Sequence, residues 1–167
     1  MADVEIELDA FLADSVTSVQ GKLYALGAGW NRIGVARFPA RHDRIGIGLL
    51  FRVPAGASAE PRRFELRLSG PSGADLTLAT GQEGAPINRI GGEFTAGGAD
   101  EQIVPIALNL NGLALPAPGD YRFAISIQGA DARILPFSVQ ALAAAGPRQA
   151  SPTTREEPPA TGTAGYL

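Results

Sequence analysis

The sequence predicts an all-β protein, an antiparallel two-sheet β-sandwich of immunoglobulin-like type with about eight or nine strands. Three observations favour this class. Glycine and proline supply 21 and 13 of the 167 residues, a larger share than proteins usually contain. Apolar and polar residues alternate with a period of two in several segments, as they do on half-buried strands. No stretch of about ten residues or more carries a convincing amphipathic helical pattern.

The clearest strand covers residues 45–53, where every second side chain from Ile45 to Val53 is aliphatic or aromatic. Such alternation places these side chains on one buried face. Shorter versions of the pattern give the other strands, and a short apolar run at 76–78 precedes a Gly-rich loop over 81–99. The predicted strands are 4–14, 22–26, 30–38, 45–53, 64–68, 93–95, 103–110, 121–127 and 134–139.

Two glycine features add detail to this pattern. Gln20-Gly21 precedes the 22–26 strand and predicts a tight hairpin turn, because glycine accepts the positive φ that such turns require. Gly46 and Gly48 fall on the outward face of the 45–53 strand, beside Leu50. They would leave a flat strip that another backbone can approach, either a docking surface or a place under a loop where crowding is relieved.

The chain divides into a predicted β-sandwich domain over residues 1–140 and a tail over 141–167. Prolines interleave with Ser, Thr, Ala and charged residues after Gly146. A segment of this composition cannot bury enough apolar surface to offset its conformational entropy, so we expect the tail to be disordered.

Composition excludes several kinds of site. The chain has no cysteine, which excludes disulfides, thiolate catalysis and cysteine-ligated metals. His42 is the single histidine, so no site can use two imidazoles from one chain. We expect no cofactor and no metal.

Charge and hydropathy bound the partners and the compartment. The net charge is -3 and the isoelectric point about 5.1, whereas nucleic-acid binders usually show a basic stripe. No uninterrupted apolar run approaches the roughly 20 residues of a membrane helix. The first residues are acidic and alternating, unlike a secretory signal. The sequence therefore predicts no nucleic-acid partner, no membrane span and a cytoplasmic protein.

Residues 118–123, Pro-Gly-Asp-Tyr-Arg-Phe, resemble the tyrosine corner of immunoglobulin-like domains. In that motif a glycine turn, here Gly119, precedes a tyrosine whose hydroxyl bonds back to the turn backbone. The resemblance implies this role for Tyr121 and an inward side chain for Phe123. It speaks to topology and not to function.

A second resemblance covers residues 4–140. It rests on Asp14, on residues 21–30 (Gly-Lys-Leu-Tyr-Ala-Leu-Gly-Ala-Gly-Trp), on the His42-to-Val53 strand and on the Pro-Gly-x-Tyr hairpin. Together these look like a family of small uncharacterised domains from high-GC bacteria. The resemblance implies domain limits and supplies no chemistry.

Protein contact is the function that we expect, as an accessory or assembly module whose partner is another protein or a second copy of the chain. An aromatic residue beside arginine is typical of interface hot spots. If Trp30 points outward it would anchor a partner, and if inward it is core. The candidate binding residues are Lys22, Trp30, Asn31, Arg32 and Leu50.

Two sharper hypotheses concern catalysis and metal binding. His42 with a carboxylate such as Asp43 could act as a general base in a hydrolase or lyase. No Gly-x-Ser-x-Gly elbow occurs, however. We favour the interpretation of His42 as a solvated loop histidine. An acidic row formed by Glu5, Glu7 and Asp9 could attract calcium. We favour a solvated strand face, with counter-charges from Arg52, Arg63 or Arg67. Weak binding to a lipid surface is a third alternative, against which the acidic balance counts.

Overall fold

The computed structural model describes residues 5–143, and these form an all-β fold. Twelve strands and one 3-10 turn, η1, lie in this range. No helix among these residues is long and apolar enough to cross a membrane. The elements are β1 (Glu7–Ala13), β2 (Ser15–Val19), β3 (Lys22–Leu26), β4 (Arg32–Val35), β5 (Ala40–Val53), β6 (Glu60–Ser69), β7 (Ala79–Thr80), η1 (Gln82–Gly84), β8 (Pro86–Ile87), β9 (Arg89–Ala96), β10 (Gln102–Leu115), β11 (Gly119–Ile127) and β12 (Ala130–Ala141).

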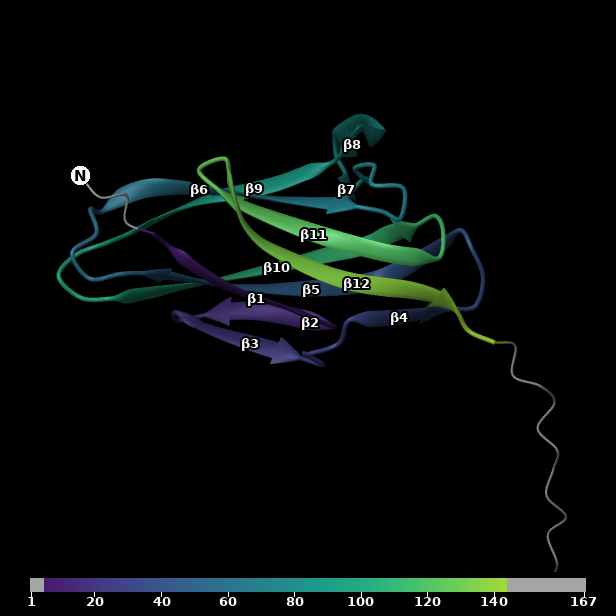
Figure 1. The fold of residues 1–167 in the computed structure, drawn as a ribbon, viewed down its shortest axis with the longest axis horizontal. Coiled ribbons are helices and arrows are strands. Elements are labelled where there is room, and N and C mark those ends of the chain that lie inside the picture. The colour runs from purple at the N-terminus through teal and green to yellow at the C-terminus, as the bar shows by residue number, and fades with distance from the viewer. Residues whose placement is uncertain (1–4, 144–167) are drawn as a thin grey trace, which may run out of the picture.

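The strands form two main sheets. One has three strands in the order β1-β5-β10, and the other has five in the order β4-β12-β11-β6-β9. The hairpin β2–β3 and the short ribbon β7–β8 make separate pairs. Figure 1 shows β6, β9 and β11 of the five-stranded sheet above the three-stranded one, β4 below β12, and the hairpin on the far side of the three-stranded sheet. The hairpin is therefore a third layer.

One pairing departs from the antiparallel prediction. β4 runs parallel to β12, with Ile33 opposite Val139. A parallel pair needs a long connection, and here nearly the whole domain separates the two strands in the sequence. Alternation along a strand predicts its faces but not its neighbour or direction, so this pairing could not be anticipated.

The core is one cluster of side chains from the facing sides of both main sheets. The predicted alternation on β5 is confirmed, since Ile45, Ile47, Leu49, Phe51 and Val53 are all fully buried. Phe51 lies 5.5 Å from Phe64 of β6 and 4.5 Å from Phe94 of β9, measured between ring centroids. These contacts join the two sheets.

Several strands were predicted too short, in the wrong place or not at all. β9 has eight residues where a strand over 93–95 was expected, and β2 was not predicted at all. The apolar run at 76–78 is not a strand, although Leu78 is buried and its N–H donates to the Ile87 carbonyl at 2.7 Å. The tail prediction falls mostly on residues outside the described range. Within that range, β12 continues to Ala141.

The hairpin β2–β3 turns at Gln20-Gly21, as predicted. Both residues have positive φ, 51° and 70°, the conformation of a two-residue hairpin turn. Gly46 and Gly48, which form the predicted glycine strip on β5, are covered by other residues of the same chain. A Cβ on Gly46 would lie 2.9 Å from the Ser15 carbonyl carbon, and one on Gly48 would collide with the Phe11 ring. A close backbone approach is therefore confirmed at Gly46, where β2 of the same chain lies, whereas at Gly48 a side chain of the neighbouring strand β1 fills the space.

Candidate binding surface

The structure distributes the five predicted binding residues over separate elements. Lys22 begins β3, Asn31 directly precedes β4, which begins at Arg32, and Leu50 is half-buried near the C-terminal end of β5. The β2–β3 turn, next to Lys22, lies well away from β4 along the long axis of the molecule (Figure 1). These residues do not form one patch.

Trp30 lies at the rim of the core. Its ring packs edge-on against Phe137 and His42, with centroid separations of 6.4 Å in each case. The side chain is half-buried, and its Nε1 atom is buried without a hydrogen-bond partner among residues 5–143. Most of the ring thus packs inside the fold, which leaves little of it to anchor a partner.

Asn31 and Arg32 line a shallow groove of about 410 Å³ beside β11 and β12. The Asn31 carbonyl accepts the Ser138 N–H at 2.9 Å, which fixes the start of β4 against β12. Asp120 and Arg122 face the same groove. Its charges are mixed, so it favours no single sign of ligand.

The hairpin β2–β3 gathers exposed apolar side chains that the sequence analysis did not select. Val19, Tyr24 and Leu26 are 48%, 53% and 74% exposed. The pairs Val19–Lys22 and Thr17–Tyr24 lie directly opposite each other, and opposite residues share a face. We call the residues on this face, Ser15, Thr17, Val19, Lys22, Tyr24 and Leu26, the hairpin face.

The other side of the hairpin is fixed to the three-stranded sheet. Val16 is 2% exposed. The Asn109 side chain accepts the Val16 N–H at 3.0 Å and donates to the Val16 carbonyl at 2.7 Å. The Ser18 hydroxyl donates to the Pro105 carbonyl at 3.3 Å. These contacts hold the hairpin so that the hairpin face points to solvent.

A different surface covers the outside of β6 and β9. It consists of ion pairs around a groove of about 760 Å³, and we call it the charged network. Its six members are Arg63, Glu65, Arg67, Arg89, Glu93 and Asp131. The closest contacts, Arg63–Glu93 and Arg89–Glu65, are both 3.1 Å. Three arginines thus meet three carboxylates.

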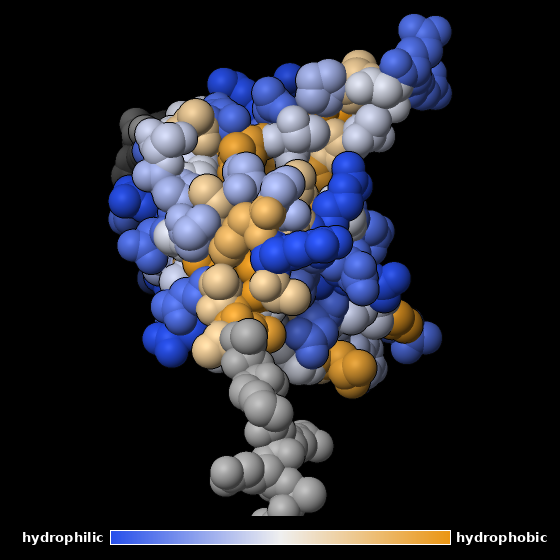
Figure 2. Space-filling view, turned by 90° about the vertical axis from the view of Figure 1, so that its right-hand side faces the viewer, coloured by the Kyte–Doolittle hydropathy of each residue, from blue (hydrophilic) through white to orange (hydrophobic). Residues whose placement is uncertain are grey.

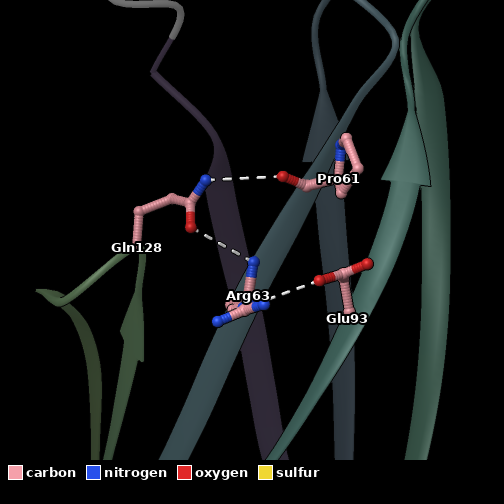
Figure 3. A network of polar contacts seen from close by, with 4 residues as sticks. All are labelled: Pro61, Arg63, Glu93 and Gln128. Atoms are coloured by element: carbon pink, nitrogen blue, oxygen red, sulfur yellow. Dashed lines mark hydrogen bonds and ion pairs between the residues drawn. The ribbon is translucent and has the colours of Figure 1, made fainter.

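Gln128 closes one end of the charged network (Figure 3). Its Oε1 accepts the Arg63 backbone N–H at 3.3 Å, and its Nε2 donates to the Pro61 carbonyl at 3.5 Å. Gln128 has a φ of 51° and is followed by Gly129, so β11 and β12 are joined by a second Gln-Gly turn. The dipeptide was a readable turn signal that the sequence analysis missed.

Arg62 is a buried cation next to this network, 7% exposed. Its guanidinium donates to three backbone carbonyls, those of Ser58, Glu60 and Ala96. No carboxylate of the described chain lies within ion-pair distance of it. The side chain therefore binds the loop before β6 to the end of β9 through carbonyl oxygens alone.

His42 lies within β5, and not in a loop before it as predicted. Its side chain is half-buried, and its ring lies 6.4 Å from the Trp30 ring in an edge-on arrangement. It lines a pocket of about 390 Å³ with Arg37, Arg41 and Asp43. Nothing in this arrangement orients the imidazole toward a carboxylate.

The acidic row is exposed, as expected, with Glu7 and Asp9 on β1 and Glu5 just before it. Asp9 pairs with Arg52 at 3.3 Å, which confirms one of the three suggested counter-charges. Arg63 and Arg67 instead pair within the charged network. Residues 5–143 contain no group of three side chains that could hold a metal ion.

Tyr121 is fully buried on β11, and its hydroxyl donates to the Ala117 carbonyl at 2.6 Å. Burial raises the pKa of this hydroxyl, while the Ala117 N–H, which donates to the hydroxyl oxygen at 3.3 Å, lowers it in part. The neutral phenol is the form that can donate this bond. Phe123 is also fully buried and points inward.

A family model for a family of unknown function, DUF6941, matches residues 8–140, which is most of the described chain. The chain belongs to this family. The DUF6941 match begins at the second residue of β1 and ends at the penultimate residue of β12, so it covers both main sheets and the hairpin. No curated protein and no solved structure matches the chain.

Proposed function

We propose that the protein is a non-catalytic interaction module, an accessory or assembly component that works by protein contact, and that the hairpin face is its contact surface. One observation carries the proposal. Three of the exposed large apolar side chains, Val19, Tyr24 and Leu26, lie on one small hairpin whose opposite side is fixed to the domain. Apolar groups gathered in this way are typical of interaction sites.

A second apolar region lies at the end of the molecule where β4 and β12 finish. Figure 2 shows apolar surface there between polar surroundings. Leu142 is 62% exposed at this end, and its N–H donates to the Val35 carbonyl at 2.7 Å. The chain continues past residue 143 from the same place. This second region adjoins residues outside the described range, whereas residues 15–26 all lie within it. We therefore assign the contact surface to the hairpin.

For the fold we propose an immunoglobulin-like sandwich. Two features support this. The two main sheets share one core between their facing sides. The bond from Tyr121 to Ala117, in the connection between β10 and β11, is the bond that a tyrosine corner requires. This part of the proposal concerns architecture and carries no function with it.

The contact surface can be tested with Tyr24→Ser combined with Leu26→Ser. Both side chains are more than half exposed, so the double variant should keep the melting temperature of the parent. We expect it to lose at least about tenfold in the amount of partner protein recovered by crosslinking in native cells, because buried aromatic and aliphatic anchors dominate interface energies.

The matched control is Ile134→Ser, which removes an apolar side chain 47% exposed on β12. It should leave recovery of the partner unchanged. Equal recovery with the double variant and the parent would refute the assignment of the hairpin face.

A further inference from the structure

β3 is the outermost strand of the hairpin layer, and one of its edges is unpaired. β2 is its sole strand partner among the described residues. Val19 and Lys22 flank a two-residue turn and form a hydrogen-bonded pair, and such pairs alternate along an antiparallel ladder. Tyr24 and Leu26 therefore bond to β2, and Leu23 and Ala25 direct their N–H and C=O groups away from it.

The other sheet edges carry features that discourage strand addition. β10 contains Pro105, which has no N–H and whose carbonyl already accepts the Ser18 hydroxyl. β4 has only four residues. β1 and β9 carry ionised side chains. β3 has a single charge, on Lys22 beside the turn, and no proline.

We propose that β3 pairs with β3 of a second copy of the chain, antiparallel and centred on Tyr24, to give a four-stranded sheet β2-β3-β3-β2. This inference rests on the proposed function and names the partner of the hairpin face. In this register Leu23 lies opposite Ala25 of the second copy. Each such pair exchanges two hydrogen bonds, so all the free N–H and C=O groups of Leu23 and Ala25 find partners.

Side-chain chemistry fits the same two-fold register. Tyr24 meets its own copy in a non-hydrogen-bonded pair, where side chains are closest and aromatic pairs are favourable. Lys22 lies opposite Leu26, so its aliphatic stem covers an apolar side chain and no like charges face each other. The two lysines are four residues apart along the strands, about 14 Å, beyond the screening length of physiological salt.

The expected strength of the β3–β3 pairing follows from the surface area that it buries. A five-residue strand buries much less than the roughly 800 Å² per partner of a stable complex. We expect reversible association that grows with protein concentration.

The absence of cysteine makes a direct test available. In the proposed register the Tyr24 Cα atoms are about 4.5 Å apart, within the range that a disulfide spans. Under mild oxidation Tyr24→Cys should give a disulfide-linked dimer as its main product. Thr17→Cys lies on the same face, directly opposite Tyr24 on β2, but its two copies would be three strand spacings apart, about 14 Å. It should give at least about tenfold less dimer.

The register can be tested separately by mixing two variants. Lys22→Cys and Leu26→Cys should crosslink to each other when mixed, and each alone should remain monomeric. Equal dimer yields from Tyr24→Cys and Thr17→Cys, or crosslinking of Lys22→Cys with itself, would overturn the proposal.

Ala25→Pro removes an N–H from the free edge and leaves the apolar hairpin face intact. We expect it to abolish concentration-dependent dimerisation in sedimentation, and an undiminished dimer would count against edge pairing. This variant also separates the two proposals. If Tyr24→Cys fails to crosslink while Tyr24→Ser with Leu26→Ser still loses the crosslinked partner, the second copy is wrong and the interaction surface stands.

Discussion

The hairpin face and the charged network are both exposed, but they differ in whether their surface groups find partners within the chain. In the charged network three arginines and three carboxylates pair with one another across β6, β9 and β12. On the hairpin face the side chains of Val19, Tyr24 and Leu26 are exposed without apolar cover, and one edge of β3 has no strand partner among the described residues. One surface pairs its own groups with one another, and the other leaves apolar side chains exposed and a strand edge unpaired among the described residues.

This difference explains why the groove of the charged network is not the surface that we propose for binding. A ligand entering the groove beside Arg63 and Arg89 would have to replace carboxylates that already lie 3.1 Å from the guanidinium groups. An apolar partner on the hairpin face displaces only water, which is favourable. Volume alone is therefore a poor guide to function in this molecule.

The largest expected loss in the free energy of unfolding comes from a substitution of Arg62, the buried cation next to the charged network. Arg62→Met keeps the apolar stem but leaves three carbonyls without their donor. We expect a loss of about 3 kcal/mol in the free energy of unfolding. Arg63→Met, one residue along, removes an exposed ion pair and should cost less than about 1 kcal/mol. Chemical denaturation of both variants measures the difference, and similar losses would contradict the distinction between them.

A smaller effect is expected from separating the hairpin from its sheet. Gly46→Val places a side chain where the Ser15 backbone lies, so the hairpin must shift and lose its bonds to Asn109. We expect a loss of about 2 kcal/mol and faster proteolysis within residues 15–26.

Gly91→Val is the matched control for that variant, because a Cβ there would lie 2.7 Å from the Phe64 carbonyl oxygen on the other main sheet. It should also destabilise the domain, but without faster cleavage of the hairpin. Equal cleavage in the two variants would show that the hairpin is not held at Gly46.

Local patterns predicted the strands well and their environment less well. Alternation identified β5, β6, β11 and β12, and Gln20-Gly21 located the hairpin turn. The same pattern cannot tell which strand lies beside which, so the parallel β4–β12 pair was missed. Arg62 and Arg63 look alike in the sequence, yet consecutive side chains on a strand point to opposite faces. Only the fold shows that one is buried among carbonyls and the other is exposed.

The candidate surface was predicted only in part. Lys22 belongs to the hairpin face, but Val19, Tyr24 and Leu26 were not selected. The reason is that β2, with the sequence Ser-Val-Thr-Ser-Val, is too polar to be read as a strand by itself. The hairpin turn was predicted but the strand before it was not, and without β2 the apolar residues of β3 look like core.

The smallest expected loss in the free energy of unfolding tests whether the ion pairs within the charged network stabilise this surface. Glu65→Gln removes the carboxylate that lies 3.1 Å from Arg89 and 3.9 Å from Arg67, and these two arginines are directly opposite each other on β6 and β9. Like charges in that position repel, so we expect a loss of about 0.5–1 kcal/mol at low salt that disappears near 1 M salt. Glu7→Gln, an exposed strand carboxylate without an ion pair among the described residues, should show neither change. A loss for Glu65→Gln that persists at high salt would mean that packing, and not charge, maintains this surface, and the contrast with the hairpin face would then lose its electrostatic basis.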